Sequence, residues 1–151
     1  MDQDAFRKTY REINERACVF EKSILSGLCK CSQSERFCLA EREGVHCNSD
    51  TAQQQCSDFV ALLREQSRFA LKSNQPGEVL SHVKTMRIQV GGMRGLYTLL
   101  HEEQPLPLAI EDIHGLLNLA IEAYESLDKI PLQPVIQQIA AYKGRRRRFD
   151  K

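Results

Sequence analysis

The chain has 151 residues, 42% of them hydrophobic and 27% charged, with a formal net charge of +1 and no tryptophan. These values are ordinary for one soluble globular domain, and no stretch approaches the roughly 18 apolar residues that a membrane span needs. The polar start "MDQDAFRKTY" lacks the apolar core of a secretory signal, so we expect a cytoplasmic protein.

The first predicted element covers residues 4–28. Apolar residues recur there at steps of three and four, which is the pattern of one helical stripe: Phe6, Tyr10, Ile13, Ala17, Phe20, Ile24 and Leu28. Gly27 lies near the end, where a left-handed cap is easily formed. The pattern predicts one long amphipathic helix.

Two further helices are predicted in the first half. Ser32 followed by Glu35 has the form of a capping box, which predicts a short helix over residues 33–43 that stops near Gly44. Asn48, Ser49 and Asp50 are capping candidates for a third helix that runs to about residue 72. The stretch "SNQPG" at 73–77 predicts a turn between two halves of the chain.

The second half also has helical patterns. Residues 78–101 are expected to be helical, although "MRIQV" alternates as a strand would. Gly91, Gly92 and Gly95 disfavour this helix, unless they let another backbone approach closely. A clear amphipathic helix follows around residues 110–127, and a last short helix begins at Pro131 or Pro134.

These elements predict an all-α fold of about six helices in a single domain, residues 1–151. A cysteine-bearing part of three helices, in the half 1–73, would pack on a helical scaffold formed by the half 78–144. A basic tail covers residues 145–151. No nucleophilic triad, acid–base pair or phosphate-binding loop stands out, so the sequence favours a role other than catalysis.

All six cysteines lie between Cys18 and Cys56, with the spacing C-x10-C-x-C-x6-C-x8-C-x8-C. In a reducing compartment, clustered thiols more often bind metal or do redox chemistry than form structural disulfides. Ordinary buried cysteines and a thiol-redox role are the alternatives. Structural zinc sites use C-x2–4-C pairs, which are absent, so we expect an iron–sulfur cluster of the [4Fe-4S] type rather than zinc.

The expected ligands are four of the six cysteines. Cys47 falls in a predicted loop, Cys56 early in the third helix and Cys18 on the flank of the first helical stripe. Cys31 precedes the predicted cap at Ser32, where helix N–H groups would favour a thiolate. The predicted set is therefore Cys18, Cys31, Cys47 and Cys56.

The other two cysteines are ranked lower. Cys29 follows Leu28 and is either a core residue or the replacement ligand, and Cys38 lies among apolar residues and is predicted to be core. Helix lengths restrict the ligand set, because an unbroken helix from Cys18 to Leu28 is about 15 Å long. All four expected ligands converge only if one of the first two helices is shorter or broken.

Histidines and the basic tail supply further candidates. His46, next to Cys47, is predicted to be an exposed loop residue rather than a ligand, and His82, His101 and His114 lack ligand spacing. Arg145, Arg146, Arg147 and Arg148 form a run that could contact the phosphates of nucleic acid or lipid.

The sequence thus predicts a [4Fe-4S] protein that acts in electron transfer, redox sensing or cluster handling through a protein partner. The alternative is a structural zinc adaptor that contacts nucleic acid through its arginine tail. A helical interaction protein without metal is the third reading.

Overall fold

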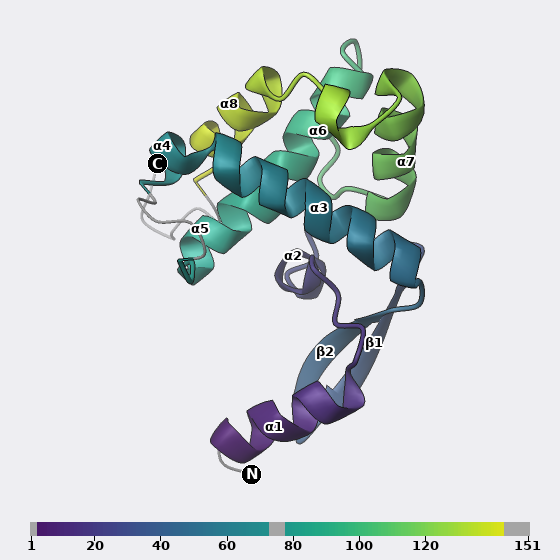
Figure 1. Cartoon of the computed structure of the whole chain (residues 1–151), viewed down its shortest axis with the longest axis vertical. Coiled ribbons are helices and arrows are strands. Elements are labelled where there is room, and N and C mark those ends of the chain that lie inside the picture. Colours follow the sequence, from purple (N-terminus) through teal and green to yellow (C-terminus); the bar gives the residue numbers. More distant parts are fainter. Residues whose placement is uncertain (1–2, 73–77, 144–151) are drawn as a thin grey trace.

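The computed structural model describes residues 3–72 and 78–143 (Figure 1). The elements in chain order are α1 (Gln3–Ile13), α2 (Glu21–Leu25), β1 (Ser34–Leu39), β2 (Arg42–Cys47), α3 (Asp50–Gln66), α4 (Arg68–Leu71), α5 (His82–Met86), the π-helical turn η1 (Arg87–Gly91), α6 (Gly92–Leu100), α7 (Ile113–Tyr124), the 3-10 turn η2 (Leu127–Lys129) and α8 (Gln133–Ala141). The predicted turn at 73–77 lies outside the described residues. The single-domain prediction with its two halves stays a prediction.

The predicted all-α fold is wrong, because residues 34–47 form an antiparallel hairpin instead of a helix. The strands pair from Ser34 opposite Cys47 to Leu39 opposite Arg42. Ala40 and Glu41 make the turn with φ values of 49° and 67°, the left-handed conformation of the tight turns that suit a hairpin. The fold is therefore mainly helical with one small sheet.

The predicted first helix is also wrong as a single element, because it breaks between Ile13 and Glu21. The Asn14 amide donates hydrogen bonds to the carbonyl of Val45 and to the hydroxyl of Tyr10, both at 3.0 Å. The Tyr10 hydroxyl in turn donates to the Glu21 carboxylate. These bonds replace helix continuation with a loop that runs against β2.

The helix α1 and the hairpin together form what we call the arm, which projects from the helices (Figure 1). Its ring contacts are few. The centroids of Tyr10 and Phe37 lie 5.7 Å apart, and the Arg42 guanidinium lies 4.5 Å from the Phe6 ring centroid. No residue of α1 is fully buried, and the Asn14 side chain directly after α1 bonds to β2.

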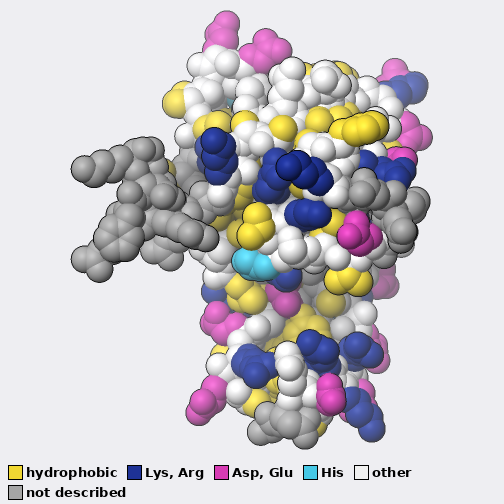
Figure 2. Space-filling view, turned by 90° about the vertical axis from the view of Figure 1, so that its left-hand side faces the viewer, with side chains coloured by type: hydrophobic (Ala, Val, Ile, Leu, Met, Phe, Trp, Pro, Cys, Tyr) yellow, Lys and Arg dark blue, Asp and Glu magenta, His cyan; other side chains and the backbone are white. Residues whose placement is uncertain are grey.

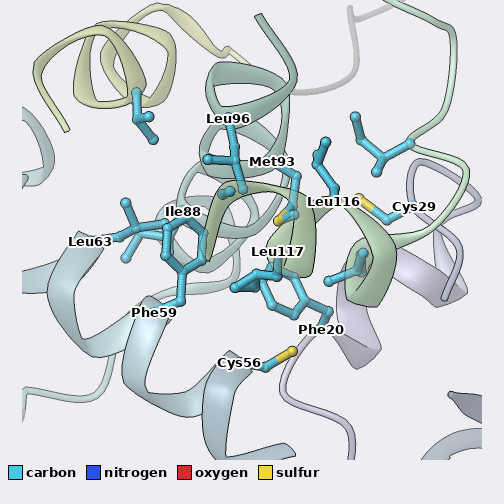
Figure 3. Close-up of a cluster of buried hydrophobic side chains, with 14 of the residues drawn as sticks. Phe20, Cys29, Cys56, Phe59, Leu63, Ile88, Met93, Leu96, Leu116 and Leu117 are labelled. Carbon is cyan, nitrogen blue, oxygen red and sulfur yellow. The ribbon is translucent and has the colours of Figure 1, made fainter. Parts of the chain in front are cut away.

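The core lies among the helices and takes side chains from both ends of the chain. Phe20, Phe59 and Leu63 meet Leu96 and Leu117 there, all of them fully or almost fully buried. Figure 3 shows this cluster, with Cys29 and Cys56 at separate edges of it. The core therefore joins the segment after Cys18 to α3, α6 and α7.

Residues 82–100 form a continuous helical run with a π turn in the middle, and a strand does not form there. Gly91 and Gly95 face α8. A Cβ on Gly91 would lie 2.8 Å from the Cα of Ile139, and one on Gly95 would lie 2.7 Å from the Cα of Val135. The glycines thus allow the close approach of a second backbone, the alternative that the sequence left open.

Candidate metal centre

Cys18 lies in the loop that separates α1 from α2. Its backbone N–H donates to the carbonyl of Val45 at 3.0 Å, and the preceding residue, Ala17, forms a β-bridge with His46. The break in the predicted helix thus places Cys18 beside β2. We expected the four ligands to come together only if one of the first two helices were shorter or broken, and the first predicted helix is broken here.

Cys31 and Cys47 lie at the open end of the hairpin. Cys31 precedes β1, and Cys47 is the last residue of β2 and pairs with Ser34. The Cys47 N–H donates to the Arg16 carbonyl at 2.7 Å, and its thiol donates to the Ser49 carbonyl at 3.3 Å. Cys47 was predicted to lie in a loop, but strand pairing holds it in a fixed place.

Cys56 lies early in α3, as predicted, and it is on the buried face of this helix. The helix begins at the N-cap Ser49, whose hydroxyl accepts the N–H of Ala52 at 3.1 Å. Ala52, Cys56, Phe59 and Leu63 then share the buried face. Cys56 shares a cavity with Cys31 and Cys47 at the hairpin end.

The four predicted ligands line one small cavity. Its walls include Cys18, Cys31, Cys47 and Cys56, with Phe20, Ala52, Ile113 and His114 beside them, and it encloses about 10 Å³. All four thiols are free. Within residues 3–72 and 78–143, no three His, Cys, Asp or Glu side chains close on a single point as they would around one bound metal ion. The four cysteines therefore line a common cavity without forming, in the described residues, a ready-made site for one ion.

Burial dominates the electrostatics of this centre. It raises the pKa of Cys18 to about 12 and that of Cys56 to about 12, and it also raises the pKa of Cys31. Repulsion between thiolates is a second cause of the raised pKa values, and it acts between every pair of the four cysteines. Without a compensating cation, Cys18, Cys31 and Cys56 keep their protons at neutral pH.

Backbone N–H groups act in the opposite direction. The Phe20 N–H hydrogen-bonds to the Cys18 sulfur, and the N–H groups of Gln33 and His114 hydrogen-bond to the Cys31 sulfur, which lowers the pKa of each. The predicted helix start after Cys31 does not exist, yet Cys31 still has N–H donors. Such donors orient a thiolate and tune a bound metal.

Cys29 and Cys38 do not line this cavity. Cys29 is fully buried in the core, and burial raises its pKa to about 11. Cys29 as the replacement ligand stays a prediction. Repulsion from the Cys31 thiolate also raises the pKa of Cys29. Cys38 was predicted to be core, which is wrong: it lies exposed on β1, on the opposite face from Phe37.

Two polar residues that the sequence analysis missed hold the segments around the centre. Gln89 is buried in the π turn, where its side-chain oxygen accepts the Ser23 N–H at 3.0 Å and its amide donates to the Val19 carbonyl at 3.1 Å. Asn14 lies within 3.1 Å of a ring nitrogen of His46, so His46 is a strand residue with a partner and not an exposed loop residue. No periodicity marks such residues, because their partners are distant in sequence.

His114 is the third residue that the sequence analysis missed. It lies in the first turn of α7, lines the cavity and supplies an N–H donor to Cys31. His114 is far from the cysteines in the sequence, with several helices between them, so no ligand spacing could have indicated its position.

The predicted contact residues Arg145, Arg146, Arg147 and Arg148 lie outside the described residues. In the described part of the chain, no helix is both long enough and apolar enough to cross a membrane. Comparison with models of protein families, with curated proteins and with solved structures found no match for this chain.

Proposed function

We propose that Cys18, Cys31, Cys47 and Cys56 bind a metal centre, specifically a [4Fe-4S] cluster. The observation that supports this most is that these four thiols, supplied by a loop, both sides of a hairpin end and a helix, line the same cavity. Burial makes Cys18, Cys31 and Cys56 costly to ionise alone, and a cation removes that cost by replacing their protons.

Two properties of the cavity bear on the kind of metal. A tetrahedral zinc site needs four sulfurs at about 2.3 Å from one ion, whereas each thiolate of a [4Fe-4S] cluster binds a different iron, so that the sulfurs stand farther apart. Within the described residues, no three Cys, His, Asp or Glu side chains close on one ion position, so the four cysteines do not form a ready-made zinc site. The small volume, about 10 Å³, suits a single ion better and keeps zinc as the alternative.

The cluster would serve electron transfer, redox sensing or cluster handling. Since the chain offers a single four-cysteine site, any electron or cluster that it gains or loses must be exchanged with another molecule. A protein partner is therefore part of the proposal. The zinc alternative would make the centre structural, with nucleic acid contacted through the arginine tail.

Metal analysis after anaerobic purification tests the proposal. We expect four iron and four sulfide per chain, with the broad visible absorption of an iron–sulfur protein. Cys18→Ser and Cys56→Ser should lose this absorption and most of the iron. Cys38→Ser, a cysteine exposed on the hairpin, is the matched control and should keep both.

The possible results separate the alternatives. One zinc per chain without iron or sulfide would favour the structural zinc site. A chain without either metal, or a Cys38→Ser variant that loses metal as completely as Cys18→Ser does, would refute the four-thiolate centre.

A further inference from the structure

The charge of this chain is unevenly distributed. Between Arg68 and His101 the sequence has one acidic residue, Glu78, and it has none from Lys129 to Phe149. The same two segments include Arg68, Lys72, Lys84, Arg87 and Lys143. Because the net charge of the whole chain is only +1, the remainder of the chain is acidic overall.

The fold brings these two basic segments together. The helix α4 packs against α8, and η1 packs against α8 as well. The Arg87 guanidinium donates to the carbonyls of Ile139 at 3.2 Å and Ala140 at 2.9 Å, which fixes the end of α8 to the start of η1. Lys143 follows two residues after the end of α8.

We call the surface formed by Lys72, Lys84, Arg87 and Lys143 the basic face. Figure 2 looks on to the side of the molecule that carries α4, α5 and the end of α8, and it shows Lys and Arg side chains gathered there. Among the described residues, no carboxylate forms an ion pair with Lys72, Lys84 or Lys143. No carboxylate of residues 3–72 and 78–143 therefore neutralises the charge of these three lysines through an ion pair.

An exposed aromatic ring lies beside these charges. Phe69 is 99% exposed on α4, between Arg68 and Lys72, while Leu71 on the opposite side of the same turn is buried. A phenylalanine pointing into water makes no contribution to the core. An exposed ring flanked by cations is the combination that binds single-stranded nucleic acid, in which bases stack on the ring and phosphates contact the cations.

We propose that the basic face and Phe69 bind single-stranded nucleic acid, with Phe69 stacking on a base. An acidic membrane surface fits less well, because α4 and α5 have only four and five residues and neither forms an extended amphipathic helix. The proposal rests on described residues and does not depend on the metal centre.

Fluorescence anisotropy with labelled single-stranded RNA and DNA oligonucleotides, over a range of salt concentrations, tests the proposal on the full chain. Each phosphate contact contributes about −0.7 to the slope of log affinity against log salt for single strands. The Lys72→Ala/Lys84→Ala double variant should therefore reduce the steepness of that slope by about 1.4. The matched control is Arg7→Ala/Lys8→Ala, which removes two exposed cations from α1 and should leave the slope unchanged.

Phe69→Ala separates stacking from simple charge attraction. Loss of one stacked base should weaken binding by about 5- to 150-fold, without changing the salt slope. Leu108→Ala is the matched control, since Leu108 is 95% exposed and lies away from the basic face in the sequence. Both positions are exposed, so neither change should unfold the chain.

Replacing Arg145, Arg146, Arg147 and Arg148 with alanine tests whether the tail alone binds. The proposal expects residual binding that still falls when Lys72 and Lys84 are removed. It is overturned if the tail accounts for all binding, if Phe69→Ala has no effect, or if vesicles containing phosphatidylserine bind the chain and oligonucleotides do not.

Discussion

Replacement of Gly91 or Gly95 by alanine should destabilise the protein, although alanine favours a helix. In an open helix the change gains about 1 kcal/mol. Here the new methyl group at Gly91 would lie 2.8 Å from the Ile139 Cα and 3.1 Å from the Gln138 carbonyl oxygen. Both are backbone atoms of α8, which cannot move aside as a side chain does.

The size of the stability loss is the cost of the close contact minus the gain in helix propensity. Forcing extra volume into a packed contact costs about 1–3 kcal/mol, and contact with backbone puts these two sites at the upper end. After the gain in helix propensity, each variant should lose about 1–2 kcal/mol of unfolding free energy. For a chain of this size, that corresponds to a fall in Tm of about 2–8 °C.

Urea unfolding followed by circular dichroism measures this loss, and Gly92→Ala is the matched control in the same helix. A Cβ at Gly92 would meet the Leu63 Cδ1 at 2.6 Å, the end of a flexible side chain that can rotate. Its effect should be close to zero. If Gly91→Ala raises the urea midpoint, or if Gly92→Ala is the most damaging of the three, the inferred close contact between α6 and α8 is wrong.

Two further predictions concern the centre and the arm. In metal-free protein at pH 8, iodoacetamide should label exposed Cys38 first, because a pKa of about 12 leaves Cys18 and Cys56 with a thiolate fraction of about 10⁻⁴. Peptide mass spectrometry would contradict this if Cys18 reacted as fast as Cys38. Asn14→Ala should cost about 1 kcal/mol, because it removes one of the two hydrogen bonds that the buried Val45 carbonyl accepts and the bond to the Tyr10 hydroxyl, while the Cys18 N–H still satisfies the carbonyl. Asn118→Ala, an exposed amide, is the control, and equal falls in Tm for the two variants would refute the role of Asn14.

The sequence predicted helices in the regions of α3, α6, α7 and α8, because each region has apolar residues at helical spacing. Ser49 is the N-cap of α3, as expected, and Pro134 lies in the first turn of α8. Gly27 has a φ of 82°, consistent with its predicted left-handed conformation. These features are local, so short-range patterns are enough to reveal them.

The hairpin was missed because its turn lacks the usual residues. Ala40 and Glu41 take up positive φ without a glycine or asparagine, and Ser32 with Glu35 imitated a helix start. A period of two was present in the sequence, since Phe37 and Leu39 alternate with exposed Arg36 and Cys38. The capping-box pattern of Ser32 and Glu35 predicts a helix in the same residues, and this conflicts with the short strand pattern.

The grouping of the cysteines was predicted better than the elements that carry them. Their clustering suggested a common site, and the requirement for a broken helix followed from distance alone. The reason for the break, the Asn14 side chain on Val45, is a contact between residues far apart in the chain. Such contacts depend on the fold and leave no periodic trace in the sequence.

The N–H donors of Cys31 have a consequence for the order of assembly on the ribosome. Gln33 is two residues away, but His114 is made long after Cys56. A nascent chain therefore presents all its sulfurs before the last donor emerges from the exit tunnel. For the proposed metal centre, we therefore expect assembly during synthesis to finish only after α7 has been translated and has docked.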